Sequence, residues 1–217
     1  MAITIKYLGV TDYADTWRAM QAFTLGRNAA TEDEIWLTEH PAVYSLGLNR
    51  KTVQLPSSSD IPVIETDRGG KITYHGLGQL IVYVLLDLTR NQWTIRDVVN
   101  ALEQSVITVL ADANISAFLM PKAPGVYVHL PNQETASQET AKIASLGLRI
   151  KNWRCYHGLS LNVDMDLSPF LAIDPCGYAG LAVTQTKDLG IKADMAQLSE
   201  VLVEKIVQNL LQSEQIV

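Results

Sequence analysis

The 217-residue sequence has little of several features that mark special classes of protein. It contains only two cysteines, Cys155 and Cys176, which excludes a small scaffold held together by several disulfides and favours a reducing, cytoplasmic setting. The longest uninterrupted apolar run, Leu80 to Leu86, is far shorter than the roughly 20 residues of a membrane-spanning helix. No basic N-terminal segment precedes a long apolar stretch, so we expect no secretory signal.

Positive charge is also scarce. Seventeen Lys and Arg residues stand against 23 Asp and Glu residues, which leaves a net charge of −6. Nucleic-acid binding needs a dense basic face, and attraction to anionic membranes needs a polybasic one, so neither partner is expected. A hydrophobic fraction of 47% is that of an ordinary globular protein, and the length suits a single domain over residues 1–217.

The hydrophobic periodicity predicts an α+β fold with a mixed sheet. Residues 79–88 are almost continuously apolar, a pattern typical of a strand buried on both faces. The polar run at residues 131–140 is expected to be an exposed loop between two strands. Because strands come in runs with few helices between them, a regular alternating α/β fold is disfavoured. Strands are predicted at 3–10, 35–37, 42–45, 63–66, 72–74, 79–88, 126–130, 142–150 and 159–163, and helices at 13–27, 94–113 and 194–212.

Residues 68–79 form the densest unusual segment. Four glycines fall within eleven residues just before the buried strand, and such a segment lets backbone approach a ligand closely. A hairpin whose turns need positive φ explains the same glycines without any ligand. The segment lacks the Gly-Lys-Ser/Thr ending of a phosphate loop, and it does not match the dinucleotide-binding fingerprint.

Cys176 and Lys142 are the candidates for reactive groups. Cys176 lies between Pro175 and Gly177, off any regular element, although a lone cysteine is more often a small buried hydrophobe than a nucleophile. A free thiol is mostly protonated at neutral pH, so a nucleophilic cysteine needs a cation or base beside it. Lys142 lies in a mostly apolar strand, where it is either desolvated or reaches out to water from an edge. The two cysteines lack the spacing of a zinc site, and no metal is expected.

The histidines give a weaker signal. His157 opens a predicted strand and is a base, a donor to substrate or a structural imidazole. His40 and His129 are interpreted as structural, and Cys155 as a packing or surface residue.

In combination, four motifs resemble the octanoyltransferases of the lipoate pathway, the lipoyl(octanoyl) transferase family. They are residues 39–47 (Glu-His-Pro-Ala-Val-Tyr-Ser-Leu-Gly), residues 68–76 (Arg-Gly-Gly through His-Gly), residues 142–147 (Lys-Ile-Ala-Ser-Leu-Gly) and residues 175–177 (Pro-Cys-Gly). The resemblance spans about residues 32 to 190 and implies the mixed sheet with flanking helices of biotin and lipoate protein ligases. One departure is visible: Leu77 stands where the family usually has proline, which leaves that loop less preorganised.

The resemblance implies transfer of an octanoyl group from octanoyl-acyl carrier protein to a lysine of a lipoyl domain. The acceptors would be the lipoyl domains of 2-oxoacid dehydrogenase complexes or the glycine cleavage H protein, and no cofactor is implied. Cys176 would carry the acyl group as a thioester, and Lys142 would lower the pKa of that thiol and shuttle its proton. Backbone N–H groups that stabilise the oxyanion of the reaction would belong either to residues 76–78 or to Gly177, and the sequence does not choose between them. The segments that match the family's substrate site comprise Arg68, Gly69, Gly70, Lys71, Ile72, Thr73, Tyr74, His75, Ser145, Leu146, Gly147, Gly158, Leu159 and Ser160.

Further expectations concern the acyl pocket and the carrier protein. Tyr74, Val82 and Leu146 are candidates for an apolar wall around the acyl chain. Residues 142–154 contain four basic residues and no acidic one, so Arg149, Lys151 and Arg154, with Arg50 and Lys51 as lesser candidates, are a hypothetical dock for an acidic carrier.

Three alternative functions remain. The first is an ATP-dependent lipoate or biotin ligase of the same fold, the second an amidotransferase acting between lipoyl domains, and the third a noncatalytic module that binds a carrier protein.

Overall fold

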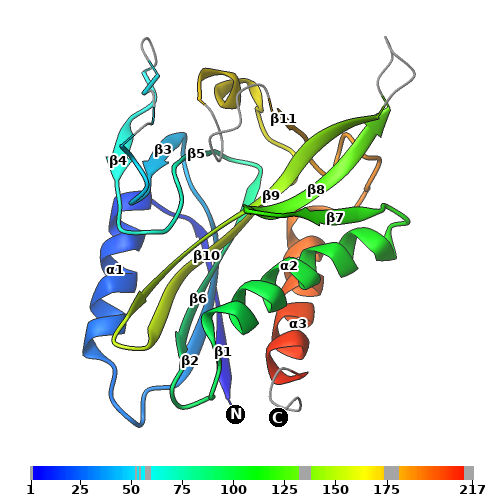
Figure 1. The fold of residues 1–217 in the computed structure, drawn as a ribbon. Coiled ribbons are helices and arrows are strands. Elements are labelled where there is room, and N and C mark those ends of the chain that lie inside the picture. Colours follow the sequence, from blue (N-terminus) through cyan, green and yellow to red (C-terminus); the bar gives the residue numbers. More distant parts are fainter. Residues whose placement is uncertain are drawn as a thin grey trace.

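The computed structural model describes residues 2–51, 53, 55–56, 60–131, 138–173 and 181–212. Within these residues an eight-stranded sheet has the order β1-β2-β6-β10-β9-β8-β7, with β11 paired to β9, and a three-stranded sheet has the order β4-β3-β5 (Figure 1). The strands of the large sheet are β1 (Ile3–Val10), β2 (Asp33–Glu39), β6 (Gln79–Asp87), β7 (Ala117–Met120), β8 (Ala123–Pro131), β9 (Gln138–Lys151), β10 (Arg154–Asn162) and β11 (Ala182–Val183). Those of the small sheet are β3 (Val43–Leu46), β4 (Val63–Glu65) and β5 (Ile72–His75).

Both sheets are mixed. In the large one, β1 pairs with β2 and β11 with β9 in parallel, whereas the other pairs are antiparallel. In the small one, β3 is parallel to β4 and antiparallel to β5. The predicted α+β class with a mixed sheet is therefore confirmed.

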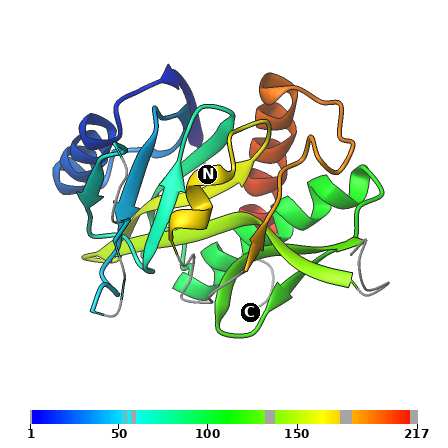
Figure 2. The same ribbon diagram turned by 90° about the horizontal axis from the view of Figure 1, so that it is seen from above.

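Three α-helices cover the two faces of the large sheet: α1 (Tyr13–Gly26), α2 (Ile95–Asp112) and α3 (Met195–Gln212). The α2 and α3 helices lie on one face and α1 on the other (Figures 1 and 2). Strand β6 alternates between these layers, since Val82 and Val84 pack in the core beneath α2 and α3 while Ile81 and Tyr83 pack beneath α1. This alternation explains its nearly continuous apolar sequence and confirms that β6 is buried on both faces.

Local signals set the helix starts. The Asp12 side chain accepts a hydrogen bond from the Asp15 N–H at 3.0 Å and caps α1. Thr94 and Asp97 form a reciprocal capping box at the start of α2. Among the helices in the described part of the chain, none combines the length and the apolar character needed to cross a membrane.

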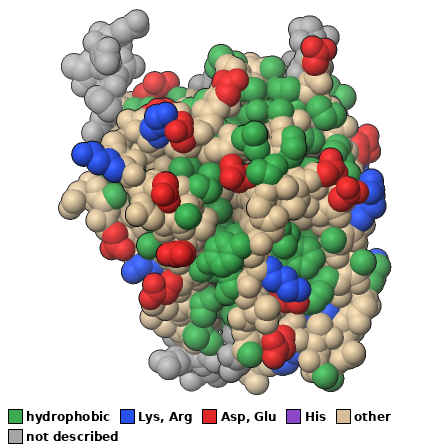
Figure 3. All heavy atoms as spheres, turned by 180° about the vertical axis from the view of Figure 1, so that it is seen from behind, with side chains coloured by type: hydrophobic (Ala, Val, Ile, Leu, Met, Phe, Trp, Pro, Cys, Tyr) green, Lys and Arg blue, Asp and Glu red, His purple; other side chains and the backbone are tan. Residues whose placement is uncertain are grey.

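The predicted elements are present, with longer bounds for several strands, while three short elements were not predicted. These are β7, β11 and a 3₁₀ helix at Ser168–Ala172 (η1). The loop predicted at 131–140 is wrong at its ends, because Pro131 pairs with Gln138 and extends the β8–β9 ladder. Residues 132–137 lie outside the described residues. On the face seen in Figure 3, Lys and Arg side chains stand apart from one another.

Candidate functional site

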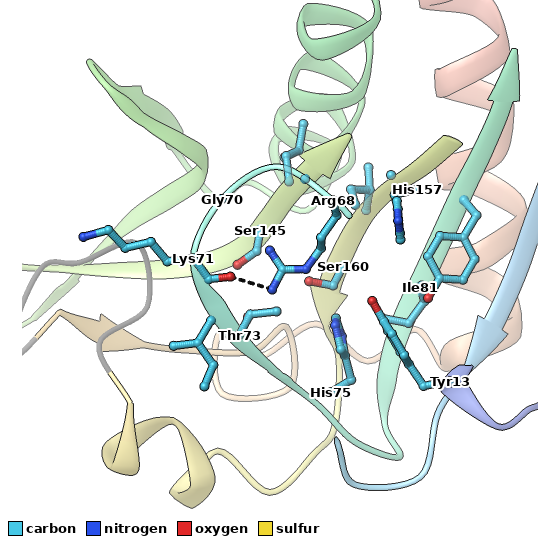
Figure 4. A pocket seen from close by; sticks show the side chains of 16 residues that line it. Tyr13, Arg68, Gly70, Lys71, Thr73, His75, Ile81, Ser145, His157 and Ser160 are labelled. Atoms are coloured by element: carbon cyan, nitrogen blue, oxygen red, sulfur yellow. Dashed lines mark hydrogen bonds between the residues drawn. The ribbon is translucent and has the colours of Figure 1, made fainter. Parts of the chain in front are cut away.

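A cavity lies where β5 and the preceding glycine segment face β9 and β10 of the large sheet (Figure 4). It has about 60 Å³ of space for water-sized molecules. Both the small sheet and α1 contribute to its walls, so it depends on the packing of separate parts of the chain. Its lining consists of Tyr13, Arg68, Gly70, Lys71, Ile72, Thr73, His75, Ile81, Tyr83, Ser145, Leu146, Gly147, His157, Gly158, Leu159 and Ser160.

The structure brings the three predicted substrate segments together at this cavity, with two of their residues placed elsewhere. Gly69 holds the segment to the large sheet by donating its N–H to the Leu148 carbonyl at 2.9 Å. The Tyr74 side chain packs in a second core, against Tyr44 and Phe170. Of the candidates for the apolar wall, Leu146 lines the cavity, whereas Tyr74 and Val82 are packed in cores instead.

Sequence reasoning did not include four lining residues: Tyr13, Ile81, Tyr83 and His157. For His157 the sequence leaves three roles open: a base, a donor to substrate or a structural imidazole. Tyr13, Ile81 and Tyr83 belong to elements that read as ordinary core, and only the tertiary packing turns them toward the cavity.

Two glycines permit the close approach of backbone in this region. A Cβ on Gly158 would lie 1.9 Å from the Val82 carbonyl oxygen, so β10 could not pack against β6 with any larger residue there. A Cβ on Gly147 would lie 3.0 Å from the Gly69 carbonyl oxygen. The backbone of the cavity therefore requires glycine at position 158, and at position 147 it leaves little room for a larger residue.

Arg68 fastens the glycine segment to the small sheet. Its buried guanidinium donates to the carbonyl of Lys71 at 2.8 Å, to that of Gly69 at 2.9 Å and to the Ser45 hydroxyl at 3.0 Å. These bonds hold the chain in the turn that forms one wall of the cavity (Figure 4).

A hydrogen-bonded chain runs from Ser45 toward β11. The Ser45 hydroxyl is 2.9 Å from His75 Nε2, and His75 Nδ1 is 2.7 Å from the Gln79 amide oxygen. Gln79 in turn donates to Asn162 at 2.9 Å, and Asn162 donates to the Thr184 carbonyl at 2.9 Å. Burial lowers the pKa of His75 to about 3, so this imidazole is neutral and serves to order the site.

Asp67 organises the α1 side of the cavity. It accepts hydrogen bonds from Trp17 Nε1 at 2.8 Å, from His157 Nε2 at 3.1 Å and from the Tyr156 hydroxyl. Partial burial raises the pKa of Asp67, but these hydrogen bonds outweigh it and hold that pKa well below its usual range. Asp67 is therefore an anion that fixes the orientation of His157.

Lys142 is buried, with 2% of its surface exposed, and thus does not reach water from a sheet edge. Its Nζ donates to the Pro124 carbonyl at 2.8 Å and lies 5.0 Å from the centroid of the Tyr127 ring. Glu103 on α2 accepts the Gly125 N–H at 2.9 Å, which holds this part of β8 next to the Lys142 side chain. Burial raises the pKa of Glu103, while the Gly125 bond and the positive charge of Lys142 oppose the rise.

Cys176 lies outside the described residues. The strand that follows it in the chain is informative, however. Ala182 of β11 is the sixth residue after Cys176, and β11 pairs Val183 with Lys142. The Thr184 N–H then donates to the Lys142 carbonyl at 3.0 Å. The fold thus brings the chain just beyond Cys176 to the strand position of Lys142.

The other cysteine has a different environment. Cys155 is buried in the main core, and burial raises its pKa to about 12. A thiol in this state is a poor nucleophile. Packing, one of the two alternatives for Cys155, is therefore confirmed.

The basic residues of 142–154 do not form one uniform surface. Arg149 Nε lies 3.9 Å from Asp67, and Arg154 donates to the Thr24 carbonyl at 3.2 Å. Lys151 is exposed near the tip of the β9–β10 hairpin.

Solved structures of lipoate and biotin protein ligases share this fold. A lipoate-protein ligase A bound with ATP superposes with a TM-score of 0.70 at 14% identity, covering 97% of this chain and 86% of that one. The biotin protein ligase from Aquifex aeolicus gives a TM-score of 0.56 at 13% identity, covering 100% and 72%.

Sequence comparison narrows the class. Residues 12–209 match the family described as "Lipoyl protein ligase A/B catalytic domain". The octanoyltransferase of Laribacter hongkongensis is 53% identical over 206 residues, 95% of each chain, and that of Chromobacterium violaceum is 51% identical over 211 residues, 97% of each chain. The chain belongs to the octanoyltransferase family.

Proposed function

We propose that this protein transfers an octanoyl group from octanoyl-acyl carrier protein to a lysine of a lipoyl domain, through a thioester on Cys176. The whole chain, residues 1–217, would act as one catalytic domain. The octanoyl transfer itself follows from the family to which the chain belongs. The observation that carries the mechanism is the position of Lys142. It is buried on β9, and β9 pairs with β11, the strand that follows the segment containing Cys176.

The first step is a thioester exchange. The step begins from the neutral amine of Lys142, which accepts the proton of the Cys176 thiol, and the thiolate attacks the carbonyl carbon of the donor. A new bond forms between Cys176 sulfur and the acyl carbon, the bond to the carrier sulfur breaks, and the carrier thiolate takes the proton from Lys142. Because one thioester replaces another, the step is nearly thermoneutral and needs no ATP.

The second step is aminolysis. The amine of the acceptor lysine attacks the same carbonyl carbon, an amide bond forms, and the bond to Cys176 sulfur breaks. Lys142 removes the proton from the attacking nitrogen and returns it to the departing thiolate. The position of Lys142 suits it to this task, because its strand pairs with β11, the strand that follows Cys176 in the chain.

The cavity along β9 and β10 supports the binding of the acyl chain. Ile72, Ile81, Leu146 and Leu159 supply an apolar lining, while the segment anchored by Arg68 closes one side. Burying a methylene stabilises binding by about 0.8 kcal/mol, so such a lining selects chain length only modestly.

The decisive experiment is an intact-protein mass spectrum after incubation with octanoyl-acyl carrier protein in the absence of ATP. We expect a mass gain of one octanoyl group that hydroxylamine removes. Cys176→Ala should abolish the gain, and the matched variant Cys155→Ala should retain it. Addition of a lipoyl domain should then discharge the adduct and move the same mass to the acceptor. Comparing octanoyl-acyl carrier protein with an octanoylated lipoyl domain as donor distinguishes this activity from that of an amidotransferase, which would prefer the lipoyl domain.

The opposite results identify the alternatives. An adduct that needs ATP and free octanoate would favour a ligase, and binding of the carrier without any transfer would favour a noncatalytic module. Transfer that survives Cys176→Ala would contradict the thioester mechanism. A reducing compartment keeps thiols free, which is the physical basis for proposing a cytoplasmic location.

Of the three residues proposed as a dock for the carrier protein, Arg149, Lys151 and Arg154, the geometry favours Lys151. Lys151 is exposed, whereas Arg149 faces Asp67 and Arg154 is bound to the end of α1. Lys151→Glu should therefore weaken binding of the carrier protein more than Arg149→Glu does. The KM for octanoyl-acyl carrier protein, measured at several salt concentrations for each variant, gives the difference. Equal KM values for wild type and Lys151→Glu would contradict a dock at this site.

A further inference from the structure

The cavity has a direction along the large sheet. Strands β9 and β10 pair Ser145 with Ser160, then Gly147 with Gly158, then Leu148 with His157, and each step leads away from Lys142. Three residues of strand, from Ser145 to Leu148, span about 10 Å. An extended eight-carbon chain with C–C bonds of about 1.5 Å spans about 9 Å. An acyl group whose carbonyl lies at the level of Ser145, the end of the cavity nearer Lys142, would thus place its last carbon at the level of His157.

The group at this far end is polar. His157 lines the cavity and is 1% exposed, and its ring lies among the lining side chains in Figure 4. Its Nε2 bonds to Asp67 at 3.1 Å, and its Nδ1 is buried with no hydrogen-bond partner among the described residues. An ionised carboxylate only accepts, so Nε2 carries the proton and Nδ1 presents a lone pair. Burial lowers the pKa of His157, which keeps the ring neutral despite Asp67.

The backbone is distorted in a way that presents this ring. His157 has φ of +66°, a left-handed conformation that a bulky side chain rarely adopts. As a result Tyr156 and His157, although adjacent in a strand, stack with ring centroids 5.1 Å apart and bond to the same carboxylate. Strain of this kind persists where the surrounding structure holds a side chain in a required position.

The neighbouring polar groups already have partners. The Tyr83 hydroxyl lies 2.7 Å from His40 Nε2, and His75 is bonded through both ring nitrogens. Among the described lining residues, His157 at Nδ1 and Thr73 at Oγ1 each have a buried side-chain polar atom without a partner, and of the two His157 Nδ1 lies beyond Ser145 and Gly147 at the end of the cavity away from Lys142.

We propose that the far end of the cavity binds a hydrogen-bond donor on the terminal carbon of the acyl chain, so that the protein also transfers ω-hydroxylated medium-chain acyl groups. The terminal hydroxyl would donate to His157 Nδ1, while the reacting bonds and protons at the thioester end are those of octanoyl transfer. This inference rests on the proposed function, because it places the carbonyl at the Ser145 end of the cavity, the end toward Lys142.

The test compares octanoyl and 8-hydroxyoctanoyl groups on the same acyl carrier protein, and the measured quantity is the ratio of their kcat/KM values. In the wild type we expect 8-hydroxyoctanoyl to react within about tenfold of octanoyl, since the hydroxyl finds a partner. His157→Phe should lower the ratio of 8-hydroxyoctanoyl to octanoyl by about tenfold, because the acceptor is lost. A ratio that stays within twofold of the wild-type value would overturn the proposal.

Two further variants keep the test interpretable. His157→Asn tolerates the left-handed backbone but is too short to reach the same point, so it should lower the ratio as well. His129→Phe makes the same change at an exposed position on β8 and should leave the ratio unaltered. Because a ratio within one variant is compared, partial unfolding lowers both rates and does not imitate the effect.

Binding measurements separate this inference from the proposed function. Calorimetry with free 8-hydroxyoctanoate and octanoate gives the preference without any chemistry. If no thioester forms on Cys176 but His157→Phe still lowers the affinity ratio about tenfold, the far-end site stands and the transfer mechanism is wrong. An unchanged affinity ratio contradicts the far-end site whatever the transfer assay shows.

Discussion

Replacing Lys142 by methionine should separate stability from activity. Its ammonium is buried, donates to the Pro124 carbonyl at 2.8 Å and lies over the Tyr127 ring. Losing a hydrogen bond from a charged group costs about 1.5–3 kcal/mol, and losing the ring contact about 0.5–2 kcal/mol. Removing the buried charge recovers several kcal/mol of desolvation, and the flexible methionine fills a similar volume. We therefore expect the free energy of unfolding to stay within about 1 kcal/mol of wild type, or to rise.

The activity of the same variant should collapse. General acid–base catalysis by a positioned side chain contributes about 10²- to 10⁴-fold, so acyl-enzyme formation should slow by that factor. Urea denaturation measures the first quantity, and single-turnover mass spectrometry of Cys176 acylation measures the second. Lys192→Met, which changes an exposed lysine, is the matched control and should alter neither.

Two results would refute this reasoning. A loss of more than about 3 kcal/mol of stability would mean that Lys142 is chiefly part of a structural ion network with Glu103. Acylation at the wild-type rate would mean that Cys176 loses its proton to another group.

Three further predictions concern stability. Gly158→Ala should lower the free energy of unfolding by about 2 kcal/mol or more in urea denaturation, because its Cβ would lie 1.9 Å from the Val82 carbonyl oxygen; an unchanged midpoint would show that β10 can shift at no cost. His75 has a folded-state pKa of about 3 against about 6.5 unfolded, so the unfolded chain binds the extra proton and stability should fall by roughly 4 kcal/mol from pH 6.5 to pH 3; His75→Gln should lessen that fall, and a parallel pH curve for the variant would contradict the assignment. Asp33→Ala should cost about 3–5 kcal/mol in chemical denaturation, because it leaves the buried Arg27 without the carboxylate it pairs with, and a loss below about 1 kcal/mol would disprove a role for this pair in stability.

Patterns local in sequence were the easiest to interpret. The run at residues 79–88 predicted a doubly buried strand, and β6 packs under helices on both faces. The short elements β7 and β11 escaped prediction because four- and two-residue strands carry little periodicity and depend on their neighbours for pairing. The polar loop was overestimated, since its ends gain ladder hydrogen bonds that composition does not reveal.

In the site, too, the residue types could be predicted from the sequence, whereas their arrangement could not. By itself the sequence determined the kind of chemistry, since Cys176, Lys142 and the glycine segments form a pattern whose residue types and order are recognisable without coordinates. Tertiary structure alone decided which side chains meet. In the folded chain the side chains of Tyr74 and Val82 pack in hydrophobic cores, and Tyr13 of α1 lines the cavity. Lys142 is buried on the strand that pairs with β11. The tertiary structure also fixed His157 against Asp67, 90 residues away in the chain. Residue types are a local property of the sequence, whereas burial and orientation arise only when distant segments pack and exclude water from the groups between them.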